Sequence, residues 1–258
     1  MTSLEGRVYA VTGGASGMGA ATVKLLARRG AAAVAVGDYN EQNFEAIKEE
    51  VKQINGTTEV TTTKIDVAES ASVKAWIEET VKAFGRLDGC ANVAGVPQKV
   101  GVRKSPTILE ETDETWRRTM AVNIDGIMYS TREEVRAMVA LPKEKRCIVN
   151  VSSMASVMHG PDTYAYTASK TACVSFSSSV AKDVMPFGIR VNTVSPGATM
   201  TPMLAQFFAD NETATHATAA VGLNMLQPED IARSIVYLLC EDSDQVMGVN
   251  LIVGSGAP

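Results

Sequence analysis

The chain reads Thr12-Gly13-Gly14-Ala15-Ser16-Gly17-Met18-Gly19 near its start. A short apolar stretch over residues 7–12 precedes these glycines and predicts a strand, and residues 20–29 repeat apolar side chains at helical spacing. A glycine-rich loop between a strand and a helix lets the backbone approach a pyrophosphate, which then lies on the helix N-terminus. The unit therefore predicts a dinucleotide site with contacts from Gly13, Ser16, Gly17, Met18 and Gly19.

Six further apolar stretches have the length of strands, and helical patterns separate them. They span residues 33–36, 60–65, 87–93, 147–151, 189–194 and 249–253. Strands that alternate with helices predict an α/β fold, in which seven parallel strands form one doubly wound sheet with helices on both faces. The chain shows no repeat, low-complexity tract or linker, so we expect one domain over residues 1–258.

Helix ends are predicted from capping residues. We expect Ser70 to cap a helix that runs to residue 84, and Asp113 to cap a helical stretch that reaches residue 141 in one or two segments. Further helices are predicted over residues 41–54, 166–185 and 231–240, whereas residues 200–226 are irregular or loosely helical. The acidic pairs are expected on solvated helix faces: Glu78-Glu79, Glu110-Glu111 and Glu133-Glu134.

The composition is that of an ordinary globular protein, with 45% apolar and 21% charged residues. The formal net charge of −5 argues against nucleic acids and anionic membrane surfaces as partners. No apolar run approaches the ~20 residues of a membrane span, and the first residues lack the apolar core of a signal peptide. The cysteines at 90, 147, 173 and 240 show neither disulfide nor zinc spacing. We therefore expect buried free thiols, no metal site and a cytoplasmic location.

An aspartate, Asp38, ends the second predicted strand, where a carboxylate about 20 residues beyond the glycines can bind the hydroxyls of the adenosine ribose. The same carboxylate would repel a 2′-phosphate, and no Lys or Arg stands in the glycine loop or beside Asp38 to offset this. The sequence therefore favours NAD over NADP. The alternative is that Asp38 is a solvated residue at a strand end.

The end of the third predicted strand also carries a carboxylate, in Asp66-Val67. This pair is placed to receive the adenine of the cofactor. The alternative for Asp66 is that it caps the turn that follows, as aspartates often do.

A tyrosine and a lysine stand four residues apart in Tyr166-Thr167-Ala168-Ser169-Lys170, so a helix places them on one face. A free tyrosine has a pKa of about 10, and lowering it to about 7 takes roughly 4 kcal/mol. A lysine ammonium about 4 Å away supplies about that much at an effective dielectric constant near 20. The pair can therefore form a phenolate that takes or returns a proton on a substrate oxygen.

Ser153 follows the strand predicted over residues 147–151, and its hydroxyl can hold the same substrate oxygen from the other side. The tyrosine–lysine spacing is a weak signal by itself, because a chain of this composition would contain it by chance about 0.3 times. The spacing gains weight beside a predicted dinucleotide site, since the cofactor supplies hydride chemistry and the protein supplies the acid or base.

These motifs occur in one order, and together they make the chain resemble the short-chain dehydrogenase/reductase family. The family pattern continues in Asn92-Val93-Ala94-Gly95, in Asn123 and in Pro196-Gly197-Ala198-Thr199-Met200-Thr201. The resemblance covers essentially the whole chain. It implies a Rossmann-type fold, a nicotinamide cofactor and a catalytic tetrad of Asn123, Ser153, Tyr166 and Lys170.

The resemblance also implies a role for each of these residues. Asn123 would hold a water that links Lys170 to solvent, and Ser153 would orient the substrate oxygen. Tyr166 would be the acid or base, and Lys170 would also bind the nicotinamide ribose. The further cofactor contacts that it implies are Asn92, Ala94 and Gly95 on the adenosine side, and Pro196, Gly197, Thr199 and Thr201 near the carboxamide.

Two motifs depart from the family pattern. Val93 stands where many members have a second asparagine, and Gly254-Ser255-Gly256 replaces the usual Asp-Gly-Gly, which bears on C-terminal and subunit contacts rather than on the chemistry. The family forms dimers or tetramers through the tyrosine helix and the helix before it, so the resemblance implies a homodimer or homotetramer. Small residues would let another helix approach the tyrosine helix closely: Ala172, Ser175, Ser178 and Ser179.

The segments that hold substrates in this family are rich in apolar side chains here, and residues 200–226 contain no Lys or Arg to pair with an acidic substrate. We therefore expect a neutral, bulky, largely apolar secondary alcohol or ketone, similar to the steroids, terpenoids or polyketides of secondary metabolism, under a lid around residues 200–226. Lys99, Arg103 and Lys104 on the other loop leave an acidic substrate open. The expected substrate contacts are Ser153, Met154, His159, Met203 and Phe207.

Two of these expectations have alternatives. His159 can equally be a loop residue without a catalytic role. The apolar side chains can pack the core beneath the lid instead of touching a substrate.

The sequence as a whole predicts an NAD-dependent oxidoreductase that interconverts a secondary alcohol and a ketone. Oxidation is the favoured direction, because cells usually hold the NAD couple oxidised. The alternatives are an NADPH-dependent ketone reductase, an isomerase or epimerase that uses NAD transiently, and a non-catalytic dinucleotide sensor. The complete tetrad argues against the sensor, since such a protein can keep the fold without it.

Overall fold

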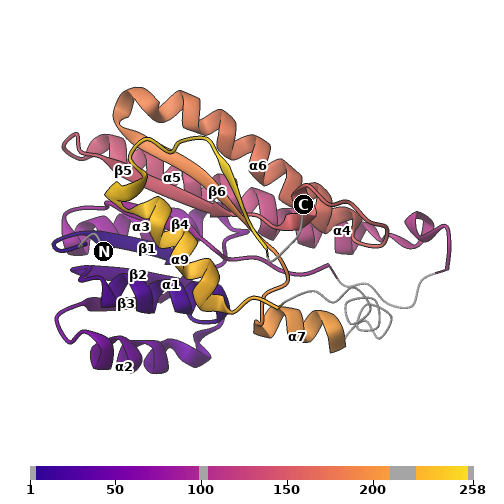
Figure 1. The fold of residues 1–258 in the computed structure, drawn as a ribbon, viewed down its shortest axis with the longest axis horizontal. Helices are drawn as coiled ribbons and strands as arrows, with labels where there is room; N and C mark the ends of the chain where they lie inside the picture. Colours follow the sequence, from indigo (N-terminus) through magenta and orange to yellow (C-terminus); the bar gives the residue numbers. More distant parts are fainter. Residues whose placement is uncertain (1–3, 99–103, 210–224, 255–258) are drawn as a thin grey trace.

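Seven strands form one sheet, in which every neighbouring pair is parallel and the order is β3-β2-β1-β4-β5-β6-β7 (Figure 1). The computed structural model describes residues 4–98, 104–209 and 225–254. The strands are β1 Val8–Thr12, β2 Ala33–Asp38, β3 Glu59–Lys64, β4 Gly89–Asn92, β5 Arg146–Val151, β6 Ile189–Pro196 and β7 Asn250–Val253. The predicted sheet and its seven strands are confirmed, with ends that move by about one or two residues.

Helices cover both faces of the sheet. On one face lie α1 (Gly17–Arg28), α2 (Phe44–Ile54) and α9 (Pro228–Leu239); on the other lie α3 (Ser70–Phe84), α5 (Gly126–Ala140) and α6 (Tyr164–Val184). Successive residues of a strand point to opposite faces, so Val11 packs in the first core and Ala10 in the second. Both faces of β1 and β2 are therefore buried, which is why these strands read as continuous apolar runs.

Two predicted helix caps are wrong. Ser70 is the first residue of α3 rather than its cap, and its hydroxyl accepts a hydrogen bond from the guanidinium of Arg132 on α5 (2.7 Å). Asp113 is likewise the first residue of α4 (Asp113–Met120), while the hydroxyl of Thr112 accepts from the backbone N–H of Thr115 (3.1 Å). At α4 the hydroxyl of Thr112 takes the capping role, whereas at α3 the hydroxyl of Ser70 bonds to α5 instead.

The helical stretch predicted from residue 113 to residue 141 consists of two α-helices joined by one wider turn. α4 runs into a π-helical turn, Ala121–Asp125, and α5 follows at Gly126. π-Helical turns in other proteins are frequent at functional sites. Asn123, the first member of the predicted tetrad, lies in this turn and is fully buried.

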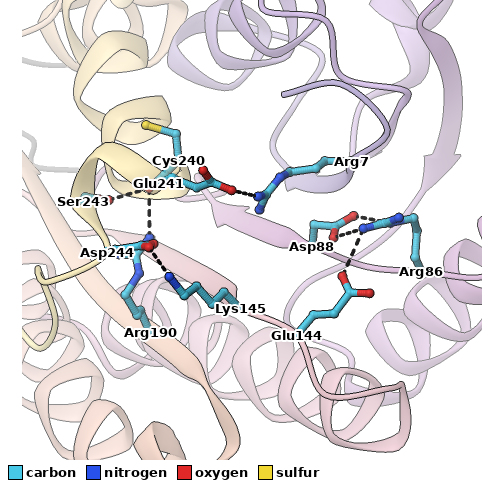
Figure 2. A network of polar contacts seen from close by, with 10 residues as sticks. All are labelled: Arg7, Arg86, Asp88, Glu144, Lys145, Arg190, Cys240, Glu241, Ser243 and Asp244. Carbon is cyan, nitrogen blue, oxygen red and sulfur yellow. Dashed lines mark hydrogen bonds and ion pairs between the residues drawn. The ribbon is translucent and has the colours of Figure 1, made fainter. Parts of the chain in front are cut away.

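A polar network ties the elements together at the edge where the strands begin (Figure 2). Asp88 precedes β4, and its carboxylate accepts from the N–H of Val8 (2.8 Å) and from two nitrogens of Arg86 (2.7 and 2.6 Å). Arg7 forms an ion pair with Glu241, which lies just after α9. Lys145, just before β5, forms one with Asp244 (2.5 Å). These contacts fix the scaffold at the edge opposite to the carboxyl ends of the strands.

Candidate active site

A cavity of about 420 Å³ opens at the carboxyl edge of the sheet. The glycine loop, the ends of β2, β3 and β4, the helix α4 and the start of α7 (Pro202–Ala209) line it. This is where ligands bind in doubly wound sheets. The predicted site residues that line it are Gly13, Ser16, Gly17, Met18, Gly19, Asp38, Asp66, Val67, Ala94, Gly95, Thr201 and Met203.

Three glycines give the loop its close approach to neighbouring backbone. A Cβ on Gly19 would lie 2.0 Å from the carbonyl oxygen of Gly13, and a Cβ on Gly13 would lie 2.9 Å from the Cα of Ala94. Gly17 has φ of +49°, and a Cβ there would lie 3.2 Å from Cγ2 of Thr201. Only glycine fits these positions, and the N-terminus of α1 opens onto the cavity. Such a cradle fits a pyrophosphate group.

Two carboxylates lie along the same cavity. Asp38 ends β2, and its oxygens accept from the N–H of Ala15 (3.0 Å) and of Asn40 (3.0 Å), which fix the carboxylate beside the glycine loop. Asp66 accepts from the N–H of Ala68 (2.9 Å) while it faces the cavity, so it caps the turn and lines the site at once. The two interpretations of Asp66 are therefore compatible.

Arg118 is the one cation among the described residues that line the cavity. It lies exposed on α4, far in the sequence from the glycine loop. No sequence motif marks this position. Arg118 reaches the cavity because α4 lines it, and the sequence spacing alone does not reveal this.

Asn92 does not line the cavity. Its side-chain amide donates to the carboxyl of Glu134 (3.0 Å) and to the side-chain oxygen of Asn150 (2.9 Å), in a buried cluster beneath the sheet. Glu134 is fully buried, and Glu133 beside it nearly so, paired with Arg132 and Arg136. The predicted solvated face for Glu133-Glu134 is wrong, because α5 turns these residues toward the sheet and toward neighbouring arginines.

Burial raises the pKa of Glu134 to about 8, although hydrogen bonds with Asn92 and Cys90 act in the opposite direction. The carboxyl therefore carries its proton at neutral pH. Burial likewise raises the pKa of the Cys90 thiol, next to Glu134. All four cysteines are buried free thiols, as predicted.

Lys170 is held in a buried position on α6. Its ammonium donates to the carbonyl oxygen of Val151 (3.1 Å), and Nζ lies 5.7 Å from the centre of the Tyr166 ring. The hydroxyl of Ser152 donates to the backbone carbonyl of Lys170 (2.7 Å), which ties α6 to the end of β5. The two motif residues therefore lie on one helix face, as their spacing predicts.

Asn123 reaches the same place from the π-helical turn. Its Oδ1 accepts from the N–H of Val96 (2.9 Å), and its Nδ2 donates to the carbonyl of Val96 (3.0 Å) and to the hydroxyl of Ser169 (3.3 Å). A Cβ on Gly95 would lie 3.2 Å from Oδ1 of Asn123 and 3.5 Å from Nζ of Lys170. Since Gly95 lines the dinucleotide cavity, Asn123 and Lys170 lie directly behind its wall.

Ser153 follows β5, and its hydroxyl accepts from the N–H of Ala155 (3.2 Å), which starts a short turn over Met154–Ser156. Met154 lies against Gly197, where a Cβ would come within 3.0 Å of its sulfur. The cavity lining does not include Pro196, Gly197 or Thr199. His159 is exposed, and its Nε2 lies 3.3 Å from the carbonyl of Ser156.

The predicted lid begins with α7, which carries Met203 and the partly exposed Phe207. The two ends of the predicted lid lie side by side. The N–H of Leu226 donates to the carbonyl of Ala198 (2.9 Å), and the carbonyl of Leu226 accepts from the N–H of Met200 (2.9 Å). Residues 210–224 of the predicted lid lie outside the described residues, as do Lys99 and Arg103.

Comparisons with known proteins agree with this geometry. A family model described as enoyl-(acyl carrier protein) reductase matches residues 13–257. The chain is 50% identical to the chanoclavine-I dehydrogenase of Penicillium roqueforti and 50% identical to that of Aspergillus fumigatus, with 100% of both chains covered in each case. A solved structure of levodione reductase matches with a TM-score of 0.90 at 26% identity, over 98% of each chain.

The match therefore extends from the glycine loop to the last strand, and it includes the region that holds Lys170 and Tyr166. The chain belongs to the short-chain dehydrogenase/reductase family, and it is an oxidoreductase that acts on a CH–OH group with a nicotinamide dinucleotide.

Proposed function

We propose that this enzyme oxidises the CH–OH group of a bulky, largely apolar alcohol with NAD, and that chanoclavine-I or a compound of similar skeleton is its substrate. The observation that carries the proposal is the identity of 50% over the full length to two chanoclavine-I dehydrogenases. The buried position of Lys170 beside Tyr166 supports the same chemistry.

Tyr166 is the proton acceptor in this proposal. The substrate hydroxyl gives its proton to the phenolate oxygen of Tyr166, and the hydroxyl of Ser153 donates a hydrogen bond to the same substrate oxygen. The ammonium of Lys170 stabilises the phenolate by electrostatic attraction, which is strong where water is excluded. A bound nicotinamide would supply the hydride acceptor for the carbinol carbon. A primary alcohol would give an aldehyde and a secondary alcohol a ketone by the same steps.

Asn123 fixes the wall of the site rather than reacting. Its side-chain amide bonds with Val96 and Ser169, and the water that the resemblance assigns to Asn123 would link Lys170 to solvent. Lys170 has the second role of binding the nicotinamide ribose, whereas Thr201 and the backbone before it hold the carboxamide. These roles are the ones implied by the family.

NAD is the cofactor in this proposal, and Asp38 selects it. Two backbone N–H groups fix the carboxylate, so it stays beside the ribose position and repels a 2′-phosphate. Arg118 on α4 is the one described cation along the cavity. Arg118 lines the cavity together with Val67 and Val122. The residue directly after Asp38 is Tyr39, and β2 contains no Lys or Arg, so this strand offers no cation to a 2′-phosphate at the ribose.

Apolar side chains support a bulky, uncharged substrate. Val157, Met158 and Met200 are each about half exposed, so the turn after β5 and the start of the predicted lid offer apolar surface to a substrate. Met154 and Met203 lie nearer the cofactor end, against Gly197 and Gly95. Methionine adapts its shape to irregular ring systems. The substrate then enters between the turn after β5 and α7.

The test is turnover of purified enzyme with chanoclavine-I, a sugar alcohol and a coenzyme-A-linked hydroxy acid, each with NAD and with NADP. We expect NADH formation with the first compound and little with the other two. A higher kcat/KM for either hydrophilic compound would refute the substrate assignment. Interconversion without net NADH formation would support the isomerase alternative, and a preference for NADPH with a ketone would support the reductase.

The proposal extends to assembly and location. We infer a homodimer or homotetramer through α6 and the helices before it, supported by the small residues Ala172, Ser175, Ser178 and Ser179 on α6. Light scattering that gives only a 27.4 kDa species would reject it. A cytoplasmic location is supported by the four free cysteines. Among the described residues, no helix is both long enough and apolar enough to cross a membrane.

A further inference from the structure

Gln98 lies buried in the segment between β4 and α4, with 2% of its surface exposed. Its side-chain oxygen accepts from the backbone N–H of Tyr166 (3.0 Å). Its side-chain nitrogen donates to the carboxylate of Glu111 (2.6 Å) and to the backbone carbonyl of Asp162 (3.2 Å). Both ends of a buried neutral amide are thus used, one of them in a short bond to a charged acceptor.

These contacts cap a helix end that has no cap of its own. The first N–H groups of any helix lack partners within it, and Thr163, at the N-cap position of α6, makes no side-chain bond to them. Gln98 supplies the acceptor from a distant segment, and it does so for Tyr166 itself. It also holds the carbonyl of Asp162, a residue with φ of +75°, at the turn into α6.

The same segment is also held two residues before Gln98, where Val96 bonds to Asn123. Val96 is bonded at both its N–H and its carbonyl to Asn123, and Gln98 follows two residues later. The segment 96–98 therefore connects Asn123, which bonds to Val96, with Tyr166, which bonds to Gln98. Lys170 lies one turn further along α6 and is held separately, by Val151.

We propose that Gln98 is a positioning residue for Tyr166, which acts by fixing the first turn of α6 through the Tyr166 N–H. The inference rests on the proposed role of Tyr166 as proton acceptor. Loss of the Gln98 contacts frees that turn and moves the phenol relative to Lys170. The dinucleotide cavity keeps its shape, because its described lining does not include Gln98. A displacement of about 1 Å at a reacting group can cost on the order of 100-fold in rate.

Gln98→Glu tests what holds the Tyr166 acceptor in place, because it replaces the donor toward Glu111 by a second carboxylate, which pushes the acceptor away from its position at the Tyr166 N–H. The two carboxylates then share one hydrogen bond only when one of them is protonated. We expect kcat of this variant to fall about 10- to 100-fold at pH 8, with the Kd for NAD within about twofold of the parent. The ratio of variant to parent kcat should rise as the pH is lowered, whereas a purely structural defect would leave that ratio flat.

The charges that face position 98 are few in the described part of the chain. Glu111, from the segment before α4, contacts Gln98 through its carboxylate, whereas Asp162 and Tyr166 contact it through backbone groups. The carboxylate of Glu110, beside Glu111, accepts from the N–H of Lys104. The double variant Gln98→Glu, Glu111→Gln exchanges donor and acceptor across the same contact. It should recover most of kcat and flatten the pH dependence of the ratio.

A matched control lies on α2, where Gln53 donates to the carboxylate of Glu49 (3.0 Å) at the surface. Gln53→Glu creates the same pair of carboxylates and should leave kcat and its pH dependence unchanged. Should Gln98→Glu fail to fold, Gln98→Met, which keeps the size and removes all three bonds, gives the same expected loss in kcat. Parent-like kcat in folded Gln98 variants would overturn the inference. Activity of Tyr166→Phe would instead overturn the proposed function.

Discussion

The ammonium nitrogen of Lys170 lies 5.7 Å from the centre of the Tyr166 ring, and its hydrogen bond to Val151 holds it there. The lysine is nearly fully buried, so its charge is screened little by water. Its position is fixed from the sheet, through Val151, rather than by the tyrosine. The charge is therefore in place before a substrate arrives, which is the arrangement that favours a developing negative charge on the phenol.

Replacing Tyr166 by Phe tests this arrangement directly. The ring stays and only the oxygen is lost, so we expect kcat to fall by about 100-fold or more while the Kd for NAD changes by less than about twofold. Lys170→Ala should damage both turnover and NAD binding, because the proposed function gives this lysine two roles. Steady-state kinetics and calorimetric NAD titration measure the two quantities, and a Tyr166→Phe variant with most of its activity would contradict the mechanism.

Replacing Asp38 by Ala tests cofactor choice. The carboxylate offers the ribose hydroxyls charged hydrogen bonds, so we expect NAD to bind about 10- to 100-fold more weakly in the variant. NADP should bind more tightly than to the parent, because the repulsion of its 2′-phosphate is removed. Titration of each cofactor with both proteins measures the change. Equal use of NAD and NADP by the parent enzyme would show that Asp38 does not select the cofactor.

Glu134 should make the stability of the fold depend on pH. Its pKa is raised from 4.5 to about 8 in the folded state, so the folded protein holds one proton more than the unfolded chain between these values. Stability from this group is therefore fully present below about pH 4.5, and it falls as the pH rises toward 8, by up to about 1.4 kcal/mol per pH unit.

Glu134→Gln, which mimics the protonated carboxyl, should flatten this dependence. Urea unfolding at several values between pH 5.5 and pH 7.5, on the order of one unit apart, measures the slope. Glu49→Gln at the surface of α2 is the control and should keep the slope of the parent. An unchanged slope in Glu134→Gln would mean that this carboxyl is ionised in the folded protein.

Asp88 should matter for stability and not for chemistry. Its carboxylate holds the N–H of Val8 and the guanidinium of Arg86 at the edge of the sheet away from the cavity (Figure 2). Asp88→Ala leaves both donors without this acceptor, so we expect a loss of about 3 kcal/mol in unfolding free energy. The exposed pair of Asp113 and Arg117 is the comparison, where Asp113→Ala should cost less than about 1 kcal/mol.

The kcat of folded Asp88→Ala should equal that of the parent, since the carboxyl edge of the sheet is untouched. A lower kcat with unchanged stability would be the opposite of this expectation. Denaturant unfolding and kinetics on the same preparation separate the two effects.

The sequence predicts the sheet well because its signals are local. Val11, Val34 and Val36 stand in short apolar runs, and Gly13, Gly17 and Gly19 occupy positions that admit no side chain. The tyrosine–lysine pair follows from helix periodicity alone. The family resemblance added Asn123, whose contact with Val96 spans elements and leaves no trace in local spacing.

The residues that were missed are all placed by packing between segments. Glu134 reads as a surface residue in a charged run, yet the docking of α5 against the sheet buries it completely. Asn92 belongs to a motif of the site, but its side chain bonds to Glu134 instead of facing the cavity. Gln98 and Arg118 stand in no motif, and their positions depend on how α6 and α4 lie against the ends of the strands.

The π-helical turn at Ala121–Asp125 has a consequence for changes in chain length. Such a turn contains one residue more than the α-helical turn it replaces. A deletion of one residue inside α4 or α5 would rotate the remainder by about 100°, whereas a deletion within this turn would leave the two helices in phase. The helix thus has a place, among the described residues, where the deletion of a residue spares the scaffold. This turn holds Asn123, a member of the proposed tetrad. We therefore expect such a deletion to lower the activity of the enzyme more than the stability of its fold.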